Sequence, residues 1–358
     1  MRVVQLLPTV SCGDAVSNDA LALEGVIAGM GLETAVYADI IDKRLPAGRV
    51  QSTGKLGRPD LRDVIIYHKS TGTELDKRLA GLDCRKLMIY HNITPPEFFR
   101  PYNTEAAALT AYGCEGLDRL RGRVDMCLAV SEFNKRGLIE RGYTCPIEVR
   151  PILIPFSDYD KEPDERIMRH FGDGRTNILF VGRIAPNKHQ EDVIKAFYFY
   201  KKHDPDARLI LAGSCAGFEN YADRLKTYVR ALGLDGVVFT GHASFPEILA
   251  YYRTASAFLC MSRHEGFCVP LIEAMYFDVP VIALDAAAVG ETLGGSGMLL
   301  SDSDPLFAAK VLERVLEDGE LRSSIIEGQR RRLGDFSYDK ISALFKSQLR
   351  TFISGGRS

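Results

Sequence analysis

Short apolar runs alternate with segments of helical period along most of the 358-residue chain. The runs are apolar almost throughout, which is typical of parallel strands covered by helices on both faces. This alternation predicts an α/β protein built on parallel sheets. We expect strands at residues 3–7, 34–40, 63–68, 86–91, 126–131 and 147–154 in the first half, and at 177–184, 207–214, 237–242, 257–262, 280–285 and 297–301 in the second.

A polar stretch at residues 157–176 interrupts the alternation and divides the chain. At roughly 150 residues per domain, each part can bury its own core. We expect an N-terminal domain at residues 1–156, a linker at 157–174 and a second domain at 175–335. Two doubly wound, Rossmann-like domains facing each other across a cleft are the economical architecture, with ligands at the carboxyl ends of the strands.

Helix signals accompany this pattern. Ser244 and Glu247 have the spacing of a capping box, which fixes a helix start in the second half. Residues 336–358 are expected to contain an amphipathic C-terminal helix. The apolar positions on its one face are Ile341, Leu344, Phe345 and Leu349.

Charge and cysteine content narrow the class of protein. Lysine and arginine total 45 against 47 aspartates and glutamates, a formal net charge of −2, which argues against a dedicated nucleic-acid-binding protein. The apolar runs fall far short of the ~20 residues that span a bilayer, and the first residues lack the pattern of a secretory signal. Eight cysteines include no Cys-x-x-Cys pair, so we expect reduced thiols and a cytoplasmic location.

Two carboxylates with seven residues between them, Glu265 and Glu273, follow the strand expected at 257–262. Pro270 suits the first turn of a helix, which places Gly266 and Phe267 just before its N-terminus, where amides and the helix dipole can hold a phosphate. A carboxylate at Glu273 can accept two hydrogen bonds from a ribose diol, and one at Glu265 can reach a hydroxylated ligand beyond the phosphates. Isolated acid pairs are usually solvated or capping residues, but strand, loop, proline and helix together favour a nucleotide-sugar site.

Two cations follow the first strand expected in the second half. Arg183 and Lys188 lie in Phe-Val-Gly-Arg-Ile-Ala-Pro-Asn-Lys, separated by a turn. A forked guanidinium and a point ammonium at this distance can hold a diphosphate. Basic residues after a strand are often only solvated, so the spacing carries this inference.

These elements resemble those of the GT-B glycosyltransferases, specifically the large retaining family numbered four, also called group 1. The resemblance covers almost the whole chain. It implies that Glu265 contacts the sugar hydroxyls and Glu273 the ribose, while Arg183 and Lys188 bind the pyrophosphate and stabilise the departing nucleotide. It also implies that the C-terminal helix crosses back onto the first domain.

The same resemblance extends the donor site along the loop after Glu265. Donor contacts are then expected from Gly266, Phe267, Cys268 and Val269, of which Gly266 and Phe267 offer backbone amides. Cys268 stands where the family more often has glycine, which bears on backbone packing and on sugar preference at this point.

Further candidates follow other predicted strands. Gly13 lets the backbone approach a ligand, although Cys12 replaces one glycine of the family's Gly-Gly loop. The resemblance implies that His91 hydrogen-bonds the transferred sugar and that His242, after Gly241, lies where the nucleotide base is received. An ordinary turn at Gly13 and a packing role for His91 stay open. His68 and Lys69 are candidates for the acceptor side.

No metal ligand is assigned. Asp158 with Asp160, and Asp302 with Asp304, match the Asp-x-Asp metal element of the other large glycosyltransferase fold, but both pairs lie in polar, turn-like stretches. We therefore expect transfer without a metal ion, with Arg183 and helix dipoles among the groups that replace it.

The predicted function is a retaining hexosyl transfer from a nucleoside-diphosphate sugar, with mannose from GDP-mannose favoured and no cofactor. The acceptor would be a hydroxyl of a saccharide or lipid-linked glycan, because the chain looks similar to enzymes of bacterial and archaeal surface-polysaccharide biosynthesis. A UDP-hexose transferase (glucose, galactose or N-acetylglucosamine), a nucleotide-sugar 2-epimerase and a non-catalytic nucleotide-sugar-binding protein stay open as alternatives. Peripheral contact with the inner face of the membrane also stays open, since basic clusters such as Arg85-Lys86 are short.

Overall fold

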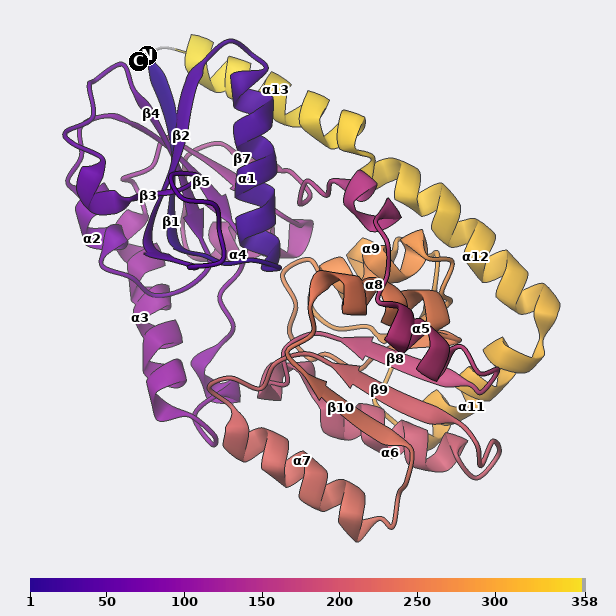
Figure 1. Cartoon of the computed structure of the whole chain (residues 1–358). Helices are drawn as coiled ribbons and strands as arrows, with labels where there is room; N and C mark the ends of the chain where they lie inside the picture. Colours follow the sequence, from indigo (N-terminus) through magenta and orange to yellow (C-terminus); the bar gives the residue numbers. More distant parts are fainter. Residues whose placement is uncertain (356–358) are drawn as a thin grey trace. The chain divides into compact units, whose positions relative to one another are not determined.

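The computed structural model describes residues 1–355, which divide into two compact units. Unit 1 consists of Met1–Pro96, Ala108–Phe156 and the residues from Asp335 onward, and unit 2 of Glu97–Ala107 and Ser157–Gly334. Each unit is built on one parallel sheet (Figure 1). The fold is therefore α/β with two Rossmann-like domains, as the strand pattern predicts.

The elements of the first half and the C-terminal helix are β1 (Arg2–Val10), α1 (Ala15–Ala28), β2 (Glu33–Ile41), β3 (Gln51–Ser52), β4 (Val64–Lys69), α2 (Leu75–Ala80), β5 (Arg85–Tyr90), α3 (Thr104–Leu120), β6 (Met126–Ala129), α4 (Glu132–Glu140), β7 (Ile147–Val149) and α13 (Tyr338–Ser354). The second half contains α5 (Glu165–Phe171), β8 (Asn177–Val181), α6 (Gln190–Tyr200), β9 (Arg208–Ala212), α7 (Glu219–Ala231), β10 (Val237–Gly241), α8 (Phe245–Thr254), β11 (Ala257–Cys260), α9 (Val269–Tyr276), β12 (Val281–Leu284), α10 (Val289–Leu293), β13 (Met298–Leu300), α11 (Pro305–Glu317) and α12 (Gly319–Leu333). Short 3₁₀ helices lie at Thr53–Lys55, Pro96–Phe98, Phe156–Asp160, Pro186–Lys188 and Gly334–Phe336.

Strand order gives each sheet one switch point. The sheet of unit 1 has the order β3-β2-β1-β4-β5-β6-β7, and that of unit 2 the order β10-β9-β8-β11-β12-β13. In both, the direction in which strands are added reverses beside the first strand, between β1 and β4 and between β8 and β11. Open α/β sheets bind ligands at the carboxyl ends of the strands at such a point.

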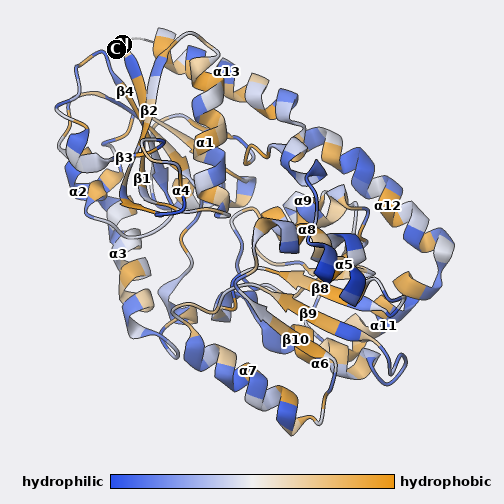
Figure 2. Ribbon diagram, viewed as in Figure 1, coloured by the Kyte–Doolittle hydropathy of each residue, from blue (hydrophilic) through white to orange (hydrophobic). Residues whose placement is uncertain are grey.

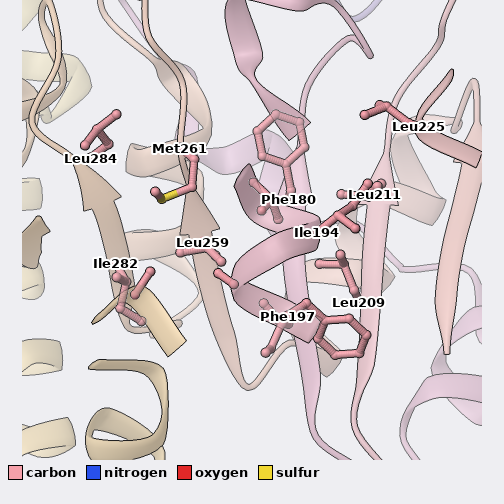
Figure 3. Packing of buried hydrophobic residues seen from close by; sticks show 14 of the residues in the cluster. Phe180, Ile194, Phe197, Leu209, Leu211, Leu225, Leu259, Met261, Ile282 and Leu284 are labelled. Atoms are coloured by element: carbon pink, nitrogen blue, oxygen red, sulfur yellow. The ribbon is translucent and has the colours of Figure 1, made fainter. Parts of the chain in front are cut away.

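The core of unit 2 forms where the apolar strands meet their helices. Phe180 and Leu259, from the two strands at the switch point, are at most 1% exposed, and Phe197 of α6 packs in the same cluster. Figure 3 shows these side chains together with Leu209 and Ile282 from neighbouring strands. Figure 2 shows that β8 and β9 are largely hydrophobic, whereas α7 alternates hydrophilic and hydrophobic positions. These packed strands hold the loops at their carboxyl ends in place.

The C-terminal helix α13 packs on unit 1. Ile341, Phe345 and Leu349 are at most 2% exposed, and the helix lies beside α1 (Figure 1). Arg85 donates to the carbonyl of Ile353 at 2.8 Å. The fourth predicted face residue, Leu344, is 36% exposed and lies outside the buried stripe.

The division differs from the predicted one in two places. Residues 157–174, predicted to be a linker, belong to unit 2 and contain α5, which is capped by Asp164 and packs on α8. Residues 97–107 also belong to unit 2, because Phe99 and Ala107 are buried in its hydrophobic core. Because α5 lies at the surface of unit 2 and is largely polar, the hydrophobic pattern does not predict it.

Smaller elements follow local signals. Ser244 and Glu247 form the predicted capping box at the start of α8. The two-residue strand β3 has no apolar run of its own and was not predicted from the pattern. Among the described residues, no helix is both long and apolar enough to cross a membrane.

Candidate active site

Both motifs of the second half lie at the switch point of unit 2. Arg183 and Lys188 follow β8, and the loop containing Glu265 follows β11, the strand that pairs with β8 in parallel register. Parallel neighbours end at the same sheet edge, so residues 77 positions apart in sequence can meet.

Lys188 and Glu265 form an ion pair. The Lys188 Nζ lies 2.6 and 2.7 Å from the two carboxylate oxygens of Glu265. The side chains are 20% and 8% exposed. Burial works against the charge of Lys188, but the Glu265 carboxylate outweighs it and holds the pKa of the lysine above its ordinary value. The chain therefore keeps a charged ammonium at the end of β8.

Backbone contacts fix the two loops to each other. The amide of Arg263 donates to the carbonyl of Asn187 at 2.9 Å, and the side-chain amide of Asn187 donates to the carbonyl of His264 at 3.3 Å. The Glu265 carbonyl accepts from Ala288 at 3.3 Å. The geometry around the ion pair is therefore set by the fold and does not depend on two flexible side chains.

Arg183 is exposed and lies against aromatic rings. Its guanidinium carbon is 5.0 Å from the centroid of the Phe218 ring and 6.0 Å from that of Phe99. Such contacts between a cation and aromatic rings orient the guanidinium. Phe99 comes from the segment 97–107, so an aromatic from the first half of the sequence supports a cation of the second.

The loop ahead of α9 turns through a left-handed residue. Cys268 has φ 71° and precedes the first helical residue, Val269, while Pro270 is second in the helix. This conformation favours glycine. That preference gives a physical reason for the glycine that the family more often has here, where this chain has Cys268. Phe267 and Cys268 are buried, and Gly266 is half-buried. The carbonyl of Phe267 accepts from Thr292, so the loop is held from behind.

Glu273 has two tyrosine partners that the sequence did not indicate. Tyr159 and Tyr252 donate to its two oxygens at 2.9 and 2.8 Å. Burial raises the pKa of Glu273, although both hydroxyls stabilise its charge. Each carboxylate oxygen has a second lone pair, so Glu273 can accept a hydrogen bond from a further hydroxyl. Tyr159 lies in the polar stretch predicted to be a linker, where no pattern marked it as a site residue.

His242 follows β10 and is exposed. Gly241, at the end of the strand, has φ 70°, a left-handed turn that directs the chain to the Ser244 cap of α8. The residue therefore lies at the carboxyl edge of the same sheet as the motif residues, and β9 and β8 separate its strand from β11.

Unit 1 carries the other predicted residues. Gly13 follows β1 with φ 78°, and a Cβ there would meet nothing within 4 Å, so the space beside its backbone is open. His91 follows β5 and is buried at 9% exposure. His68 and Lys69, at the end of β4, are fully buried. Lys69 is paired with Asp76 at 2.6 Å and does not line a surface.

Two groups of three possible metal ligands occur among the described residues, each within 4.8 Å. They are Asp19, His68 and His91 in unit 1, and Cys260, Glu265 and Cys268 in unit 2. In each, the carboxylate already binds a cation of the chain. Arg150 donates to both oxygens of Asp19 at 2.9 and 2.6 Å, as Lys188 does to Glu265. A divalent ion would have to displace a bonded side chain, so these donor sets fit a metal poorly.

The two Asp-x-Asp stretches have local roles. Asp160 accepts from the Tyr276 hydroxyl at 2.6 Å, and Asp158 pairs with Lys161. Asp304 caps α11 by accepting from the amide of Leu306 at 2.8 Å. None of the four shares a group of metal-ligating side chains in the described part of the chain.

One hollow of about 400 Å³ lies elsewhere in unit 2. Its walls are residues 100–105 with Gly217, Glu219 and Asn220, none of which is a motif residue. Its wall residues are neighbours in sequence of Phe99 and Phe218, whose rings lie against Arg183. We place the chemistry at the motif residues, because charged groups converge there.

Residues 162–332 match the family model described as glycosyl transferases group 1. This segment of the chain is therefore similar to the group 1 glycosyltransferases. The chain is 29% identical over 199 residues to D-inositol 3-phosphate glycosyltransferase of Jonesia denitrificans, covering 54% of this chain and 47% of that protein. It is 27% identical over 286 residues to the putative glycosyltransferase YtcC of Bacillus subtilis, covering 75% and 67%. The chain thus spans about half the length of the first relative and two thirds of the second.

Solved structures extend the likeness to the whole fold. Sucrose-phosphate synthase of Thermosynechococcus elongatus matches with a TM-score of 0.76 at 17% identity, over 99% of this chain and 100% of that one. Anabaena Alr3699/HepE in complex with UDP-glucose matches with a TM-score of 0.75 at 17% identity, over 98% and 100%. At such identities the likeness concerns the fold alone, which is GT-B.

Proposed function

We propose that the chain transfers a hexosyl unit from a nucleoside-diphosphate sugar to a hydroxyl, with retention of anomeric configuration and without a metal ion. The observation that carries this proposal is the meeting of Lys188 and Glu265 at the switch point of unit 2, at 2.6 Å. A diphosphate binds to cations, and a sugar binds to hydrogen-bond acceptors. The carboxyl edge of the sheet of unit 2 offers Lys188 for the first and Glu265 for the second, and Glu273 is proposed to bind the ribose.

In the proposed step the bond between the anomeric carbon and the phosphate oxygen breaks, and the acceptor oxygen bonds to the same face of that carbon. The acceptor's proton passes to the departing phosphate. Arg183 and Lys188 stabilise the negative charge that develops on this phosphate, which is the interaction that strengthens toward the transition state. When the diphosphate binds the Lys188 ammonium, Glu265 would lose its contact with Lys188 and accept hydrogen bonds from sugar hydroxyls instead.

Two donors are the first to compare. GDP-mannose follows from the resemblance to mannosyltransferases, and UDP-glucose is the ligand named for the HepE structure that shares this fold. The acceptor is proposed to be a saccharide or a lipid-linked glycan, with the protein acting in the cytoplasm. The roles of Gly13, His91 and His242 stay predictions within this proposal.

The test is a thermal-shift screen with UDP-glucose, GDP-mannose, UDP and GDP, because a ligand that binds the native state raises the melting temperature. Donors that bind are then incubated with oligosaccharide acceptors, with and without a chelator. We expect one nucleotide class to bind and transfer to be insensitive to chelation. No shift with any nucleotide would overturn the proposal, sugar rearrangement without acceptor would identify an epimerase, and binding without turnover a binding protein.

A further inference from the structure

Two thiols of unit 1 lie in contact with each other. Cys127 is the second residue of β6, and Cys145 lies in a bend two residues before β7. Their Sγ atoms are 3.6 Å apart, although the two residues are 18 positions apart in sequence. A disulfide has its sulfurs about 2.05 Å apart, so a small shift of the bend or a rotation of one side chain brings the two sulfurs to bonding distance.

The backbone holds the two thiols side by side. β6 and β7 are parallel neighbours in which Cys127 is paired with Ile147. The amide of Cys127 donates to the carbonyl of Pro146 at 2.9 Å, so the residue directly after Cys145 is bonded to Cys127 itself. The bend follows a turn with a left-handed glycine, Gly142, at φ 79°. One thiol therefore stands on a buried strand and the other on a connecting segment, which can move more readily.

The two thiols differ in exposure and in acidity. Cys127 is fully buried, whereas Cys145 is half-buried. With the Cys127 thiol as donor of their hydrogen bond, the pKa of Cys145 is lowered and that of Cys127 is raised. The thiolate is the form of cysteine that attacks a disulfide. In this pair it forms on the residue that solvent reaches.

A second pair of thiols, in unit 2, provides a comparison. The Sγ atoms of Cys260 and Cys268 lie within 4.8 Å of each other. Both residues are at most 6% exposed. A small oxidant therefore has access to one member of the pair in unit 1 and to neither member of the pair in unit 2.

We infer that Cys127 and Cys145 form a thiol–disulfide exchange site, which reacts with small disulfides of the glutathione class and becomes an intramolecular disulfide. The Cys145 thiolate attacks one sulfur of the small disulfide, whose S–S bond breaks, and the first small thiolate leaves. Cys127 then loses its proton and attacks the Cys145 sulfur, which releases the second small thiolate. Both released thiolates take up protons, so the protein dithiol is oxidised and the small disulfide is reduced to two thiols.

This inference rests on the geometry of unit 1 and is independent of the proposed transfer reaction. It is tested by incubating the native full-length protein with oxidised glutathione, blocking the remaining thiols with N-ethylmaleimide and mapping the peptides by mass spectrometry. We expect a link between Cys127 and Cys145, with the loss of two hydrogens, before any link between Cys260 and Cys268 appears. If Cys127 and Cys145 both stay free, or if the pair in unit 2 is oxidised first, the inference is wrong.

Single substitutions separate the roles of the two thiols. Cys127→Ser removes the thiol that displaces glutathione, so we expect the mixed disulfide to accumulate on Cys145. Cys145→Ser removes the thiol that reacts first, and we expect the buried Cys127 to stay unmodified. Cys114→Ser, which removes another half-buried thiol of unit 1, is the matched control and should leave the link unchanged. Glutathione on Cys127 in Cys145→Ser would contradict the assigned order, and the wild-type result decides whether the link forms even where a variant fails to fold.

The link would also close the loop that contains α4, which Ser131 caps. Closing a loop of this length restricts the unfolded chain, so we expect the melting temperature of the cross-linked protein to be several degrees above that of the reduced protein. Cys127→Ser treated with the same oxidant should show no such rise. An unchanged or lower melting temperature of the cross-linked protein would show that the native bend does not accommodate the link, and would overturn the inference.

Discussion

Two lysine–carboxylate pairs of equal length lie at the switch points of the two units, yet they differ in almost every other respect. Lys188 and Glu265 are 20% and 8% exposed, whereas Lys69 and Asp76 are fully buried. Lys69 also donates to the carbonyl of Thr71 at 2.9 Å, so that pair is locked into the fold. The Lys188 Nζ, in contrast, makes both of its contacts with one carboxylate, that of Glu265.

The pKa shifts of the two lysines point in opposite directions. Burial lowers the pKa of Lys69 in spite of Asp76, while Glu265 raises the pKa of Lys188 in spite of burial. The same pair of residue types is therefore locked into the fold in unit 1, and we propose that it is exchangeable in unit 2. The two pairs have the same length, so the difference between them lies in burial and not in proximity.

Breaking the buried pair should give the largest effect. Lys69→Met leaves the Asp76 carboxylate buried with the Tyr67 hydroxyl, at 2.7 Å, as its remaining side-chain donor among the described residues. We expect the free energy of unfolding to fall by about 3–5 kcal/mol, measured by chemical denaturation. Lys188→Met is the matched comparison, and we expect a smaller loss because the Lys188 side chain is 20% exposed, whereas that of Lys69 is fully buried. Equal losses would remove the distinction.

Gly116 of α3 offers a check on the same pair without removing a charge. A Cβ there would lie 2.0 Å from an oxygen of Asp76 and 2.7 Å from Lys69 Nζ. Gly116→Ala should therefore destabilise the protein, although alanine normally stabilises a helix by about 1 kcal/mol over glycine. Gly137→Ala in α4, where a Cβ meets nothing within 4 Å, should show the normal sign.

Lys188 should matter most for turnover. If its ammonium stabilises the departing phosphate, Lys188→Met lowers kcat by about 10²–10³, the usual cost of losing one preorganised donor. Initial rates with saturating donor measure this. Lys195→Met, on the adjacent helix and paired with Asp192 at 3.0 Å, is the charge-matched control and should leave kcat unchanged. A normal kcat in Lys188→Met would contradict the proposed role of the ion pair.

The neutral histidines of unit 1 predict acid sensitivity. Burial lowers the pKa of His91 from 6.5 to about 4, so the unfolded chain binds a proton that the folded chain does not. Stability should therefore fall as the pH decreases through this window, by about 1.4 kcal/mol per pH unit from this group and about 3 kcal/mol in total. Denaturation curves at stepped pH measure the slope, and His91→Gln should flatten it. An equal slope in both proteins would show that other groups cause it.

Sequence reasoning located the sheet and the charged motifs because both depend on local pattern. The twelve apolar runs became strands, and Arg183, Lys188 and Glu265 were expected at strand ends, where they lie. Tyr159 and Phe99 could not be found this way. Their relation to Glu273 and Arg183 depends on how distant segments pack, and neither stands in a motif.

The contact between His68 and His91 shows the same limit in unit 1. The sequence predicts His91 as a site residue from its place after a strand, and His68 is a candidate for the acceptor side. Gln5, in the middle of an apolar strand, gave no signal, because only the parallel pairing of β1 with β4 brings it to His68. Long-range register, which the pattern of one strand does not contain, decides such contacts.

The smallest expected effect concerns the backbone beside the exchangeable pair. Cys268 has φ 71°, so glycine should be favoured over alanine there by about 1 kcal/mol. Comparing Cys268→Gly with Cys268→Ala isolates this difference, since both lose the thiol. Ala108→Gly, at an exposed position of α3, is the control and should have the opposite sign, a loss of about 1 kcal/mol. If alanine is the more stable replacement at 268, the left-handed turn is not what sets the loop before α9. The geometry of Glu265 must then be held by the contact of its carboxylate with Lys188 and by the hydrogen bond that its backbone carbonyl accepts from Ala288.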